Sequence, residues 1–503
     1  MKKTFADYQS PELFSSIRAF GTTSEMWENC LMKYADSPAI VYDGQTHTFS
    51  ELEADAAILR TALLGAGLKA GDRVSVFAPN SYEFVKAFLA VSTSGMTAAV
   101  IPAQLDEMSL FGVTMKFSAK AILYAPVLEG KLNIAKAKGI PCISTDAAAE
   151  KGSPINKNVK PEDGCAIMFT GGTTGKSKGA LLSNRAVMQG TANGCYGLEV
   201  VYGQRYLLAI PLSHVFGLIR NLLTSLYTGS ALFICKDNKD LFRDIAMFRP
   251  TMLVVVPALA EMALALSRRF GKNMLGEDMK YIICGAAAVA PYLVTEYEKM
   301  GIHLCPGYGL TETANLVSGN PDFLAKPDSV GLLYPNQEVK IVDGELWLKG
   351  ANLMDGYVGD PEENAAAFED GWFKTGDLVR FDDEGFLYIT GRKKELIILD
   401  NGENISPAEV EAFFNKIELV QDSQIFEAVD ENGKHYLSLE VVPRMTEIAK
   451  LGAEKPMEVL MAELVKVNQS LPAYERAQKI VIRETDFVRT PSMKIIRYKL
   501  EKN

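Results

Sequence analysis

The chain has 503 residues, of which 48% are hydrophobic and 23% are charged. This balance is ordinary for a globular protein and excludes a disordered, collagen-like or coiled-coil chain. The net charge is 52 − 62 = −10, so bulk attraction to nucleic acid or to an anionic membrane surface is not expected.

The cysteines and the N-terminus indicate a reducing compartment. The seven cysteines are scattered without a CxxC pair, and there are only four histidines, so we expect neither a disulfide framework nor a structural zinc site. Lys2 and Lys3 are not followed by an apolar segment, and we therefore expect no signal peptide. The most apolar long stretch, Met252–Leu266, is interrupted by Pro257 and Glu261 and is too short to cross a bilayer. A cytoplasmic protein fits these features best.

The first two thirds of the chain alternate between helical patterns and short apolar runs. Ser50 and Glu53 predict a capping box at the start of a helix that ends near Gly65 and Gly67. The apolar face of this helix carries Leu52, Ala56, Leu59 and Leu63. Buried strands are predicted at Val74–Ala78, Ala166–Phe169, Tyr206–Ile210, Leu232–Cys235, Met252–Val256 and Tyr281–Cys284. This alternation predicts an α/β architecture with largely buried strands.

After about residue 330 the pattern changes to short strands and turns. The runs Leu378–Phe381 and Phe386–Thr390 flank the turn Asp382–Gly385, which predicts a β-hairpin. Ser406 and Glu409 form a second capping-box pattern, with proline at the first helical position. The chain beyond about residue 395 is therefore predicted to form a small separate α+β unit.

The most distinctive segment follows the strand predicted at 166–169. Residues 170–179 contain four glycines, three threonines, one serine and two lysines. Glycines let the backbone turn its N–H groups inward, and the hydroxyl and ammonium groups add donors, which is the chemistry of a phosphate cradle. The segment is not a Walker A loop, because Thr170 stands where that motif requires glycine. A flexible linker is the alternative interpretation.

This loop resembles the signature of the adenylate-forming superfamily, which includes acyl-CoA synthetases, adenylation domains of peptide synthetases and beetle luciferases. Further segments resemble the motifs of that family in the same order, at Pro211–Gly217, Gly307–Thr313, Thr375–Asp377 with Gly391-Arg392, and Arg489–Arg497. The chain departs from the family pattern at Ser177, where proline is usual, and at Met493, where glycine is usual.

The resemblance implies an α/β fold with a large N-terminal domain over residues 1–391, built of packed sheets with helices plus a small distorted β-barrel. It implies a hinge at 392–394 and a small mobile α+β C-terminal domain at 395–503, which rotates about Lys394. One orientation presents Lys494 for adenylation, because its charge stabilises the meeting of a carboxylate with the α-phosphate of ATP. The other opens a tunnel for a thiol, lined by Gly402, Glu403 and Asn404.

The resemblance also implies ATP and Mg²⁺ as ligands. Asp377 offers two acceptor oxygens to the ribose hydroxyls, Tyr308 stacks on adenine, and Glu312 suits Mg²⁺ as a hard oxygen ligand. The residues implied to contact ATP are Thr170, Gly171, Gly172, Thr173, Thr174, Gly175, Lys178, Gly285, Ala286, Ala287, Tyr308, Gly309, Thr311, Asp377, Arg392 and Lys494. The catalytic residues implied are Lys494, His214, Thr311 and Glu312.

Each of these assignments has a structural alternative. Asp377 could be a turn residue, Tyr308 a core aromatic and Glu312 a surface carboxylate. Lys494 could belong to a solvated basic face, and His214 could be a core residue. His214 is not expected to act as a general base, because a carboxylic acid is already ionised at neutral pH.

The acid pocket implied by the resemblance is formed by His214, Val215, Phe216, Gly285, Gly309 and Leu310. Between Tyr206 and Cys235 there is no acidic residue, and the single charge is Arg220. A substrate ammonium group would lack a partner there, which disfavours an amino acid. We therefore expect an uncharged acyl or aryl tail, such as a fatty acid.

The sequence thus predicts an ATP-dependent acid–thiol ligase that forms an acyl-adenylate and then a thioester with CoA. One alternative is a freestanding adenylating enzyme that loads the phosphopantetheine of an acyl carrier protein. A catalytically inactive nucleotide-binding protein is an alternative of another class, suggested by Ser177 and Met493. No nucleic-acid partner is expected, and the chain length of the acid and the oligomeric state stay open.

Overall fold

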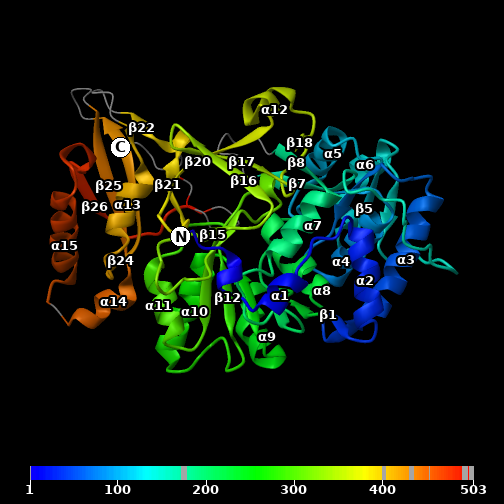
Figure 1. Ribbon diagram of the computed structural model, residues 1–503, viewed down its shortest axis with the longest axis horizontal. Coiled ribbons are helices and arrows are strands. Elements are labelled where there is room, and N and C mark those ends of the chain that lie inside the picture. Colours follow the sequence, from blue (N-terminus) through cyan, green and yellow to red (C-terminus); the bar gives the residue numbers. More distant parts are fainter. Residues whose placement is uncertain are drawn as a thin grey trace.

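The computed structural model describes residues 2–170, 178–398, 404–429, 435–452, 454–489, 495 and 497. The described strands form two large sheets, a smaller antiparallel sheet and a C-terminal unit with sheets of its own. Figure 1 shows the C-terminal unit, in orange and red, at one end of the molecule, with the N-terminal third at the other.

The first large sheet has a parallel centre and an antiparallel edge. Its described strands run in the order β18-β8-β7-β4-β3-β5-β6. The strand bounds are β3 Arg73–Phe77, β4 Thr97–Ile101, β5 Ala121–Tyr124, β6 Cys142–Ser144, β7 Gly164–Thr170, β8 Lys178–Ser183 and β18 Gly356–Tyr357. β7 and β8 pair antiparallel, with Thr170 opposite Lys178, so the glycine-rich segment connects two strands of a hairpin.

The second large sheet runs in the order β15-β14-β13-β12-β11-β9-β10-β1-β2 among the described strands. Their bounds are β1 Pro38–Tyr42, β2 Gln45–Thr48, β9 Arg205–Leu208, β10 Ala231–Ile234, β11 Met252–Val255, β12 Tyr281–Cys284, β13 His303–Tyr308, β14 Ser318–Gly319 and β15 Leu332–Leu333. The six strands from β13 to β1 are parallel, which matches the continuous apolar runs in the sequence.

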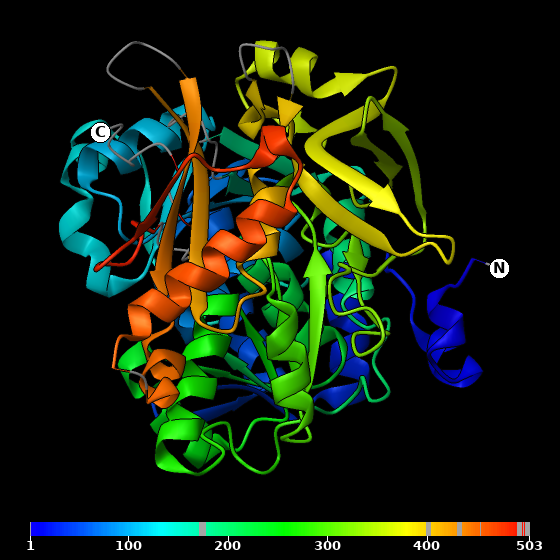
Figure 2. The same ribbon diagram turned by 90° about the vertical axis from the view of Figure 1, so that its left-hand side faces the viewer.

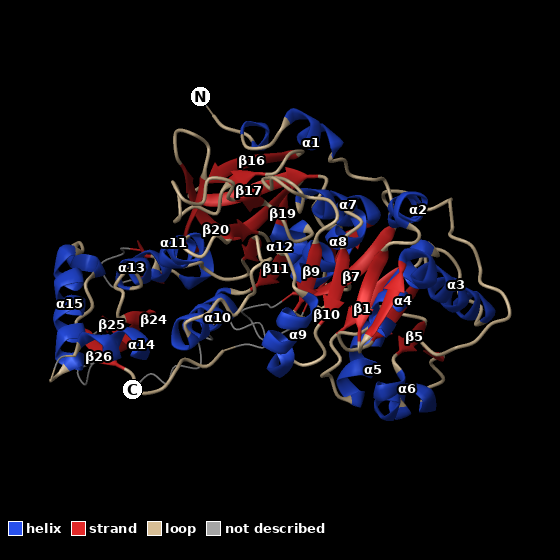
Figure 3. Cartoon of the chain, turned by 90° about the horizontal axis from the view of Figure 1, so that it is seen from below, coloured by secondary structure: helices blue, strands red, loops and turns tan. Residues whose placement is uncertain are grey.

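Helices surround both sheets, as the view from below shows (Figure 3). Those before residue 200 are η1 Phe5–Asp7, α1 Pro11–Ser16, α2 Thr23–Tyr34, α3 Phe49–Gly65, α4 Tyr82–Thr93, α5 Glu107–Lys116, η2 Pro126–Lys131, α6 Asn133–Ala137 and α7 Asn184–Asn193. Those that follow are η3 Phe216–Leu223, α8 Thr224–Tyr227, η4 Asn238–Asp240, α9 Leu241–Phe248, α10 Pro257–Phe270, α11 Pro291–Glu298 and η5 Thr311–Thr313. One continuous core joins the two sheets through α4 and α7.

The start of α3 differs from the prediction. Its capping box is formed by Thr48 and Glu51, two residues before the predicted pair of Ser50 and Glu53. Glu53 instead accepts a hydrogen bond of 2.8 Å from the indole of Trp27 and pairs with the buried Arg60. Both residue pairs fit the sequence pattern, and these long-range partners of Glu53 decide between them.

The described strands of the third sheet are β16 Gln337–Val342, β17 Glu345–Gly350, β19 Phe368–Glu369, β20 Trp372–Phe381 and β21 Leu387–Arg392, with α12 Pro361–Ala367 beside them. β20 and β21 form the predicted hairpin. The antiparallel pairing places Asp377 of β20 opposite Arg392 of β21, although 15 residues separate them along the chain.

The C-terminal unit, in orange and red, faces the viewer in Figure 2. It has its own hydrophobic core. Its elements are η6 Lys393–Glu395, β22 Ile397–Ile398, β23 Asn404–Ile405, α13 Pro407–Phe414, β24 Val420–Val429, β25 His435–Pro443, α14 Met445–Ile448, η7 Ala449–Leu451, α15 Pro456–Ser470, η8 Ala473–Glu475 and β26 Lys479–Ile482. Ser406 caps α13 as predicted. The α/β fold with a large N-terminal and a small C-terminal unit is confirmed, whereas the mobility of the smaller unit stays a prediction.

Candidate active site

A cavity of about 950 Å³ lies where the strands of the two large sheets end. Thr170 ends β7, Tyr308 ends β13, and Gly285 directly follows β12; all three line the cavity. Crevices outside the carboxyl ends of parallel strands are the usual ligand sites of α/β proteins. The third sheet and the segment that follows it close one side, through Thr375, Arg392 and Lys394 among others.

Asp377 lies behind the wall of the cavity and positions two of the residues that form it. It is 1% exposed; its Oδ2 accepts a 2.5 Å hydrogen bond from the hydroxyl of Tyr308, and its Oδ1 lies 2.8 Å from Nε of Arg392. Burial, followed by the adjacent Asp377 carboxylate, raises the pKa of Tyr308 well above its ordinary value, so the hydroxyl stays protonated and donates. Asp377 therefore fixes the orientation of Tyr308 and Arg392, both of which line the cavity.

A second series of interacting polar side chains consists of Glu312, Tyr357, Lys178 and Glu363. The hydroxyl of Tyr357 donates to Oε1 of Glu312 at 2.7 Å, and Nζ of Lys178 lies 4.9 Å from the centre of the Tyr357 ring. Lys178 also pairs with Glu363, although its side chain is only 14% exposed. All four residues line the cavity and place a lysine and a carboxylate close to each other there.

The segment before η3 shapes the cavity beside Tyr308. Asn80 holds this segment, because its side-chain amide donates to the carbonyl of Ile210 and accepts from the backbone N–H of Leu212. Nδ1 of His214 accepts a 3.2 Å hydrogen bond from the backbone N–H of Phe216. This hydrogen bond fixes the orientation of the imidazole ring beside Phe216.

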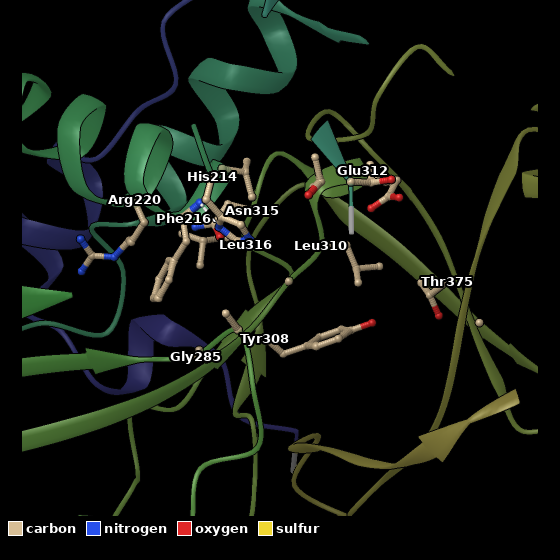
Figure 4. A pocket seen from close by; sticks show the side chains of 18 of the residues that line it. His214, Phe216, Arg220, Gly285, Tyr308, Leu310, Glu312, Asn315, Leu316 and Thr375 are labelled. Carbon is tan, nitrogen blue, oxygen red and sulfur yellow. Dashed lines mark hydrogen bonds between the residues drawn. The ribbon is translucent and has the colours of Figure 1, made fainter. Parts of the chain in front are cut away.

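Figure 4 shows His214, Phe216, Gly285, Tyr308 and Leu310 around the middle of the cavity, with Glu312 to one side. Of the predicted residues, the structure places Thr170, Lys178, His214, Val215, Phe216, Gly285, Ala286, Tyr308, Gly309, Leu310, Thr311, Glu312, Arg392 and Lys394 in the cavity wall. Asp377 lies behind the wall, and Ala287 is exposed outside it.

Several predicted residues lie outside the described part of the chain. These are Gly171, Gly172, Thr173, Thr174, Gly175, Gly402, Glu403 and Lys494. The backbone of Asn404 is described and pairs with Ile398 in the short ladder of β22 and β23. The roles expected for these residues stay predictions.

The structure adds lining residues that the motifs do not contain, including Tyr334, Glu345, Tyr357 and Glu363. Glu345 is 4% exposed; it accepts from the backbone N–H of Gly376 and pairs with Lys393 at 3.0 Å. Glu345 and Tyr357 lie on strands, Glu363 lies on α12, and Tyr334 directly follows β15. Packing between distant segments brings them to the cavity, so no local sequence pattern identifies them.

Comparison with known proteins agrees with this geometry. Residues 27–358 match the AMP-binding enzyme family, and residues 394–503 match the AMP-binding enzyme C-terminal domain. The long-chain-fatty-acid–CoA ligase of Yersinia pestis is 29% identical over 466 residues, which cover 80% of this chain and 81% of that protein.

Solved structures share the whole fold. An anthranilate CoA ligase in complex with anthranoyl-AMP has a TM-score of 0.84 at 20% identity, covering 97% of this chain and 98% of its own. The o-succinylbenzoate coenzyme A synthetase of Bacillus subtilis, in complex with ATP and magnesium, has a TM-score of 0.77 at 25% identity, covering 94% and 98%.

The chain therefore belongs to the AMP-binding enzyme family and is an ATP-dependent acid–thiol ligase of the acyl-CoA ligase type. Within the described residues, no helix is both long and apolar enough to cross a membrane.

Proposed function

We propose that the enzyme joins a carboxylic acid to CoA in two steps. The acid first attacks the α-phosphate of ATP and releases pyrophosphate, and the CoA thiol then displaces AMP from the acyl-adenylate. The observation that carries this proposal is a single cavity that joins a polar part, with Lys178 and Glu312, to an apolar part around Phe216. An acyl-adenylate needs both parts at once.

The polar part suits a magnesium-bound triphosphate. In the described part of the chain, Oε1 of Glu312 accepts from Tyr357 and Oε2 has no hydrogen-bond partner. Mg²⁺ in nucleotide sites is typically held by one or two carboxylates together with substrate phosphates, so Glu312 fits as its protein ligand. When bound, Mg²⁺ would neutralise charge on the phosphates. Lys178 and Thr311 supply a cation and a hydroxyl from the wall of the same cavity.

Tyr308 and Arg392 form the part of the wall that we assign to the nucleoside. Asp377 holds both side chains. Contact between Asp377 and the ribose stays a prediction from the family resemblance. We assign His214 to the carboxylate of the acid, because it lines the cavity beside Phe216.

The carboxylates that line the cavity disfavour an amino acid as substrate. Glu312 is bonded to Tyr357, Glu345 to Lys393, Glu363 to Lys178 and Glu395 to Arg497. A substrate ammonium group would have to displace one of these partners, compete with Mg²⁺ for Oε2 of Glu312, or remain unpaired, which is costly in a buried site. The acid that we propose has an apolar body and no cationic group.

The C-terminal unit would serve the two steps in turn. We propose that the chain divides at a hinge over 392–394, that Lys394 is the pivot, and that Lys494 enters the cavity for adenylation. A second orientation would present the loop at 402–404 to the thiol. Such exchange lets one cavity run two reactions that need different groups.

A mass-spectrometric product screen tests the function. Purified protein is incubated with Mg-ATP, CoA and a panel of aliphatic, aryl and amino acids. An acyl-CoA product with AMP and pyrophosphate supports the proposal. Acyl-adenylate and pyrophosphate without acyl-CoA would favour a carrier protein as acceptor, and the absence of AMP and pyrophosphate with every acid would favour the inactive nucleotide-binding protein.

A further inference from the structure

Arg220 is a buried cation in the wall of the active-site cavity. It lies on η3, one turn after Phe216, and both residues line the cavity. The residue is 2% exposed. Figure 4 shows Arg220 on the far side of Phe216 from Glu312, which places it away from the part assigned to the phosphates.

The guanidinium of Arg220 lacks an anionic partner. Its Nη2 donates to the sulfur of Met252 at 3.6 Å. The centre of the Tyr206 ring lies 5.9 Å from the guanidinium carbon. Nη1 is buried without a hydrogen-bond partner, and no carboxylate of the described residues lies within ion-pair distance of the group. The phenol of Tyr206 also interacts with the Arg220 side chain. A thioether, an aromatic ring and a neutral phenol carry no net charge, so none of them balances a buried cation.

The titratable neighbours of Arg220 do not supply a negative charge. Burial raises the pKa of the Cys195 and Cys305 thiols to about 12 despite the nearby guanidinium, so both stay neutral at physiological pH. Burial likewise raises the pKa of Tyr206 and Tyr334 above the ordinary tyrosine value. Arginine does not lose its proton in proteins, so the charge of Arg220 persists without compensation.

A second unpaired donor lies in the same cavity wall. Nδ2 of Asn315 is buried without a hydrogen-bond partner, and the residue is 6% exposed. Among the described residues that line the cavity, these two nitrogens are the buried side-chain polar atoms without a partner. Both are donors, so the ligand that satisfies them must bring acceptors. Buried polar groups without partners are rare in native proteins and call for such an explanation.

We propose that the acid substrate carries a second anionic group at the end remote from its reacting carboxylate, and that Arg220, with Asn315 as an additional donor, binds this group. The inference rests on the proposed function and specifies its substrate class as dicarboxylic acids or acids with an equivalent terminal anion. It replaces the expectation of an uncharged tail. The sequence shows Arg220 as the one charge between Tyr206 and Cys235, but it does not show that Arg220 lines the cavity.

The test compares acids in matched pairs with the wild-type enzyme, Mg-ATP and CoA. Each pair has one chain length, with or without a terminal carboxylate: butanoate and succinate, hexanoate and adipate, octanoate and suberate. We expect kcat/KM to favour the dicarboxylate by about a hundredfold in the pair of best-fitting length, because a site built around buried donors rejects a ligand that leaves them unpaired. Thioester formation with monocarboxylates at higher kcat/KM in every pair would overturn the inference while leaving the ligase function intact.

Variants separate substrate binding from a structural role. R220M removes the charge at similar length, and we expect it to reverse the preference within the best pair. R220K keeps the positive charge but lacks the planar guanidinium with its paired N–H donors. For this variant we expect a ratio of kcat/KM between dicarboxylate and monocarboxylate that lies between those of the wild type and R220M. R269M changes an exposed arginine on α10 and serves as the control, with the wild-type ratio.

Thermal melting of the ligand-free variants provides an independent readout. An unpaired buried charge destabilises the fold, so R220M should melt at a higher temperature than the wild type. A lower melting temperature together with an unchanged preference would show that Arg220 is structural and would overturn the inference. The wild-type comparison stands even if R220M does not fold.

Discussion

The cavity wall depends on a close backbone contact at Gly309, which lines the cavity. A Cβ atom at position 309 would lie 1.3 Å from the carbonyl oxygen of Asn315 and 2.4 Å from its carbonyl carbon. Both are backbone atoms, so no side-chain rotation relieves the clash. Reaching 3.0 Å would require the two segments to separate by 3.0 − 1.3 = 1.7 Å.

Gly309→Ala therefore displaces the segment that carries Tyr308 and Glu312. We expect a loss of about 3 kcal/mol in the free energy of unfolding, at the upper end of the usual cost of overpacking. Misplacement of reacting groups by about 1 Å can cost roughly a hundredfold in rate, and we expect kcat/KM to fall at least that far. Pyrophosphate release with the best acid of the screen measures the rate, and thermal melting follows the stability.

Gly307→Ala is the matched control. It lies two residues earlier in the same segment, but the nearest atom to its Cβ would be the carbonyl oxygen of Ser318 at 3.4 Å, which is ordinary contact. We expect this variant to keep most of its stability and activity. Wild-type activity in Gly309→Ala, or equal loss in both variants, would refute the reasoning from backbone contact.

Three further variants test the polar groups. Asp377→Asn weakens the interactions that hold Tyr308 and Arg392 in the cavity wall. Because charge-assisted hydrogen bonds contribute about 1.5–3 kcal/mol, we expect the KM for ATP to rise about tenfold or more. An unchanged KM would contradict this role of Asp377. Lys178→Met should likewise raise the KM for ATP, whereas the exposed Lys120→Met should not, and equal effects would argue against a phosphate contact. Burial raises the pKa of Glu261 above 4.5, so its ionised form opposes folding at neutral pH. Glu261→Gln should therefore melt at a higher temperature at pH 7, and this gain should vanish in melts below about pH 4.5; a gain independent of pH would contradict the cause.

Local patterns predicted much of the secondary structure and the polar part of the site. The hairpin of β20 and β21 was predictable because its turn residues and its apolar runs are adjacent in the chain. The parallel strands were predictable because burial on both faces leaves continuous apolar runs. Thr170 and Lys178 belong to one short motif, and the structure places both in the cavity wall.

The sequence by itself determined the order of elements, the family and the motif residues, because each depends on residues close together in the chain. Only the tertiary structure decided that Thr48 rather than Ser50 caps α3, since Trp27 and Arg60 engage Glu53 from a distance. It also decided the environment of Arg220, which cannot be read from the sequence. Whether a buried charge is paired depends on which distant segments pack around it, and the packing brings neutral thiols, phenols and Met252 to this arginine, with no described carboxylate in reach.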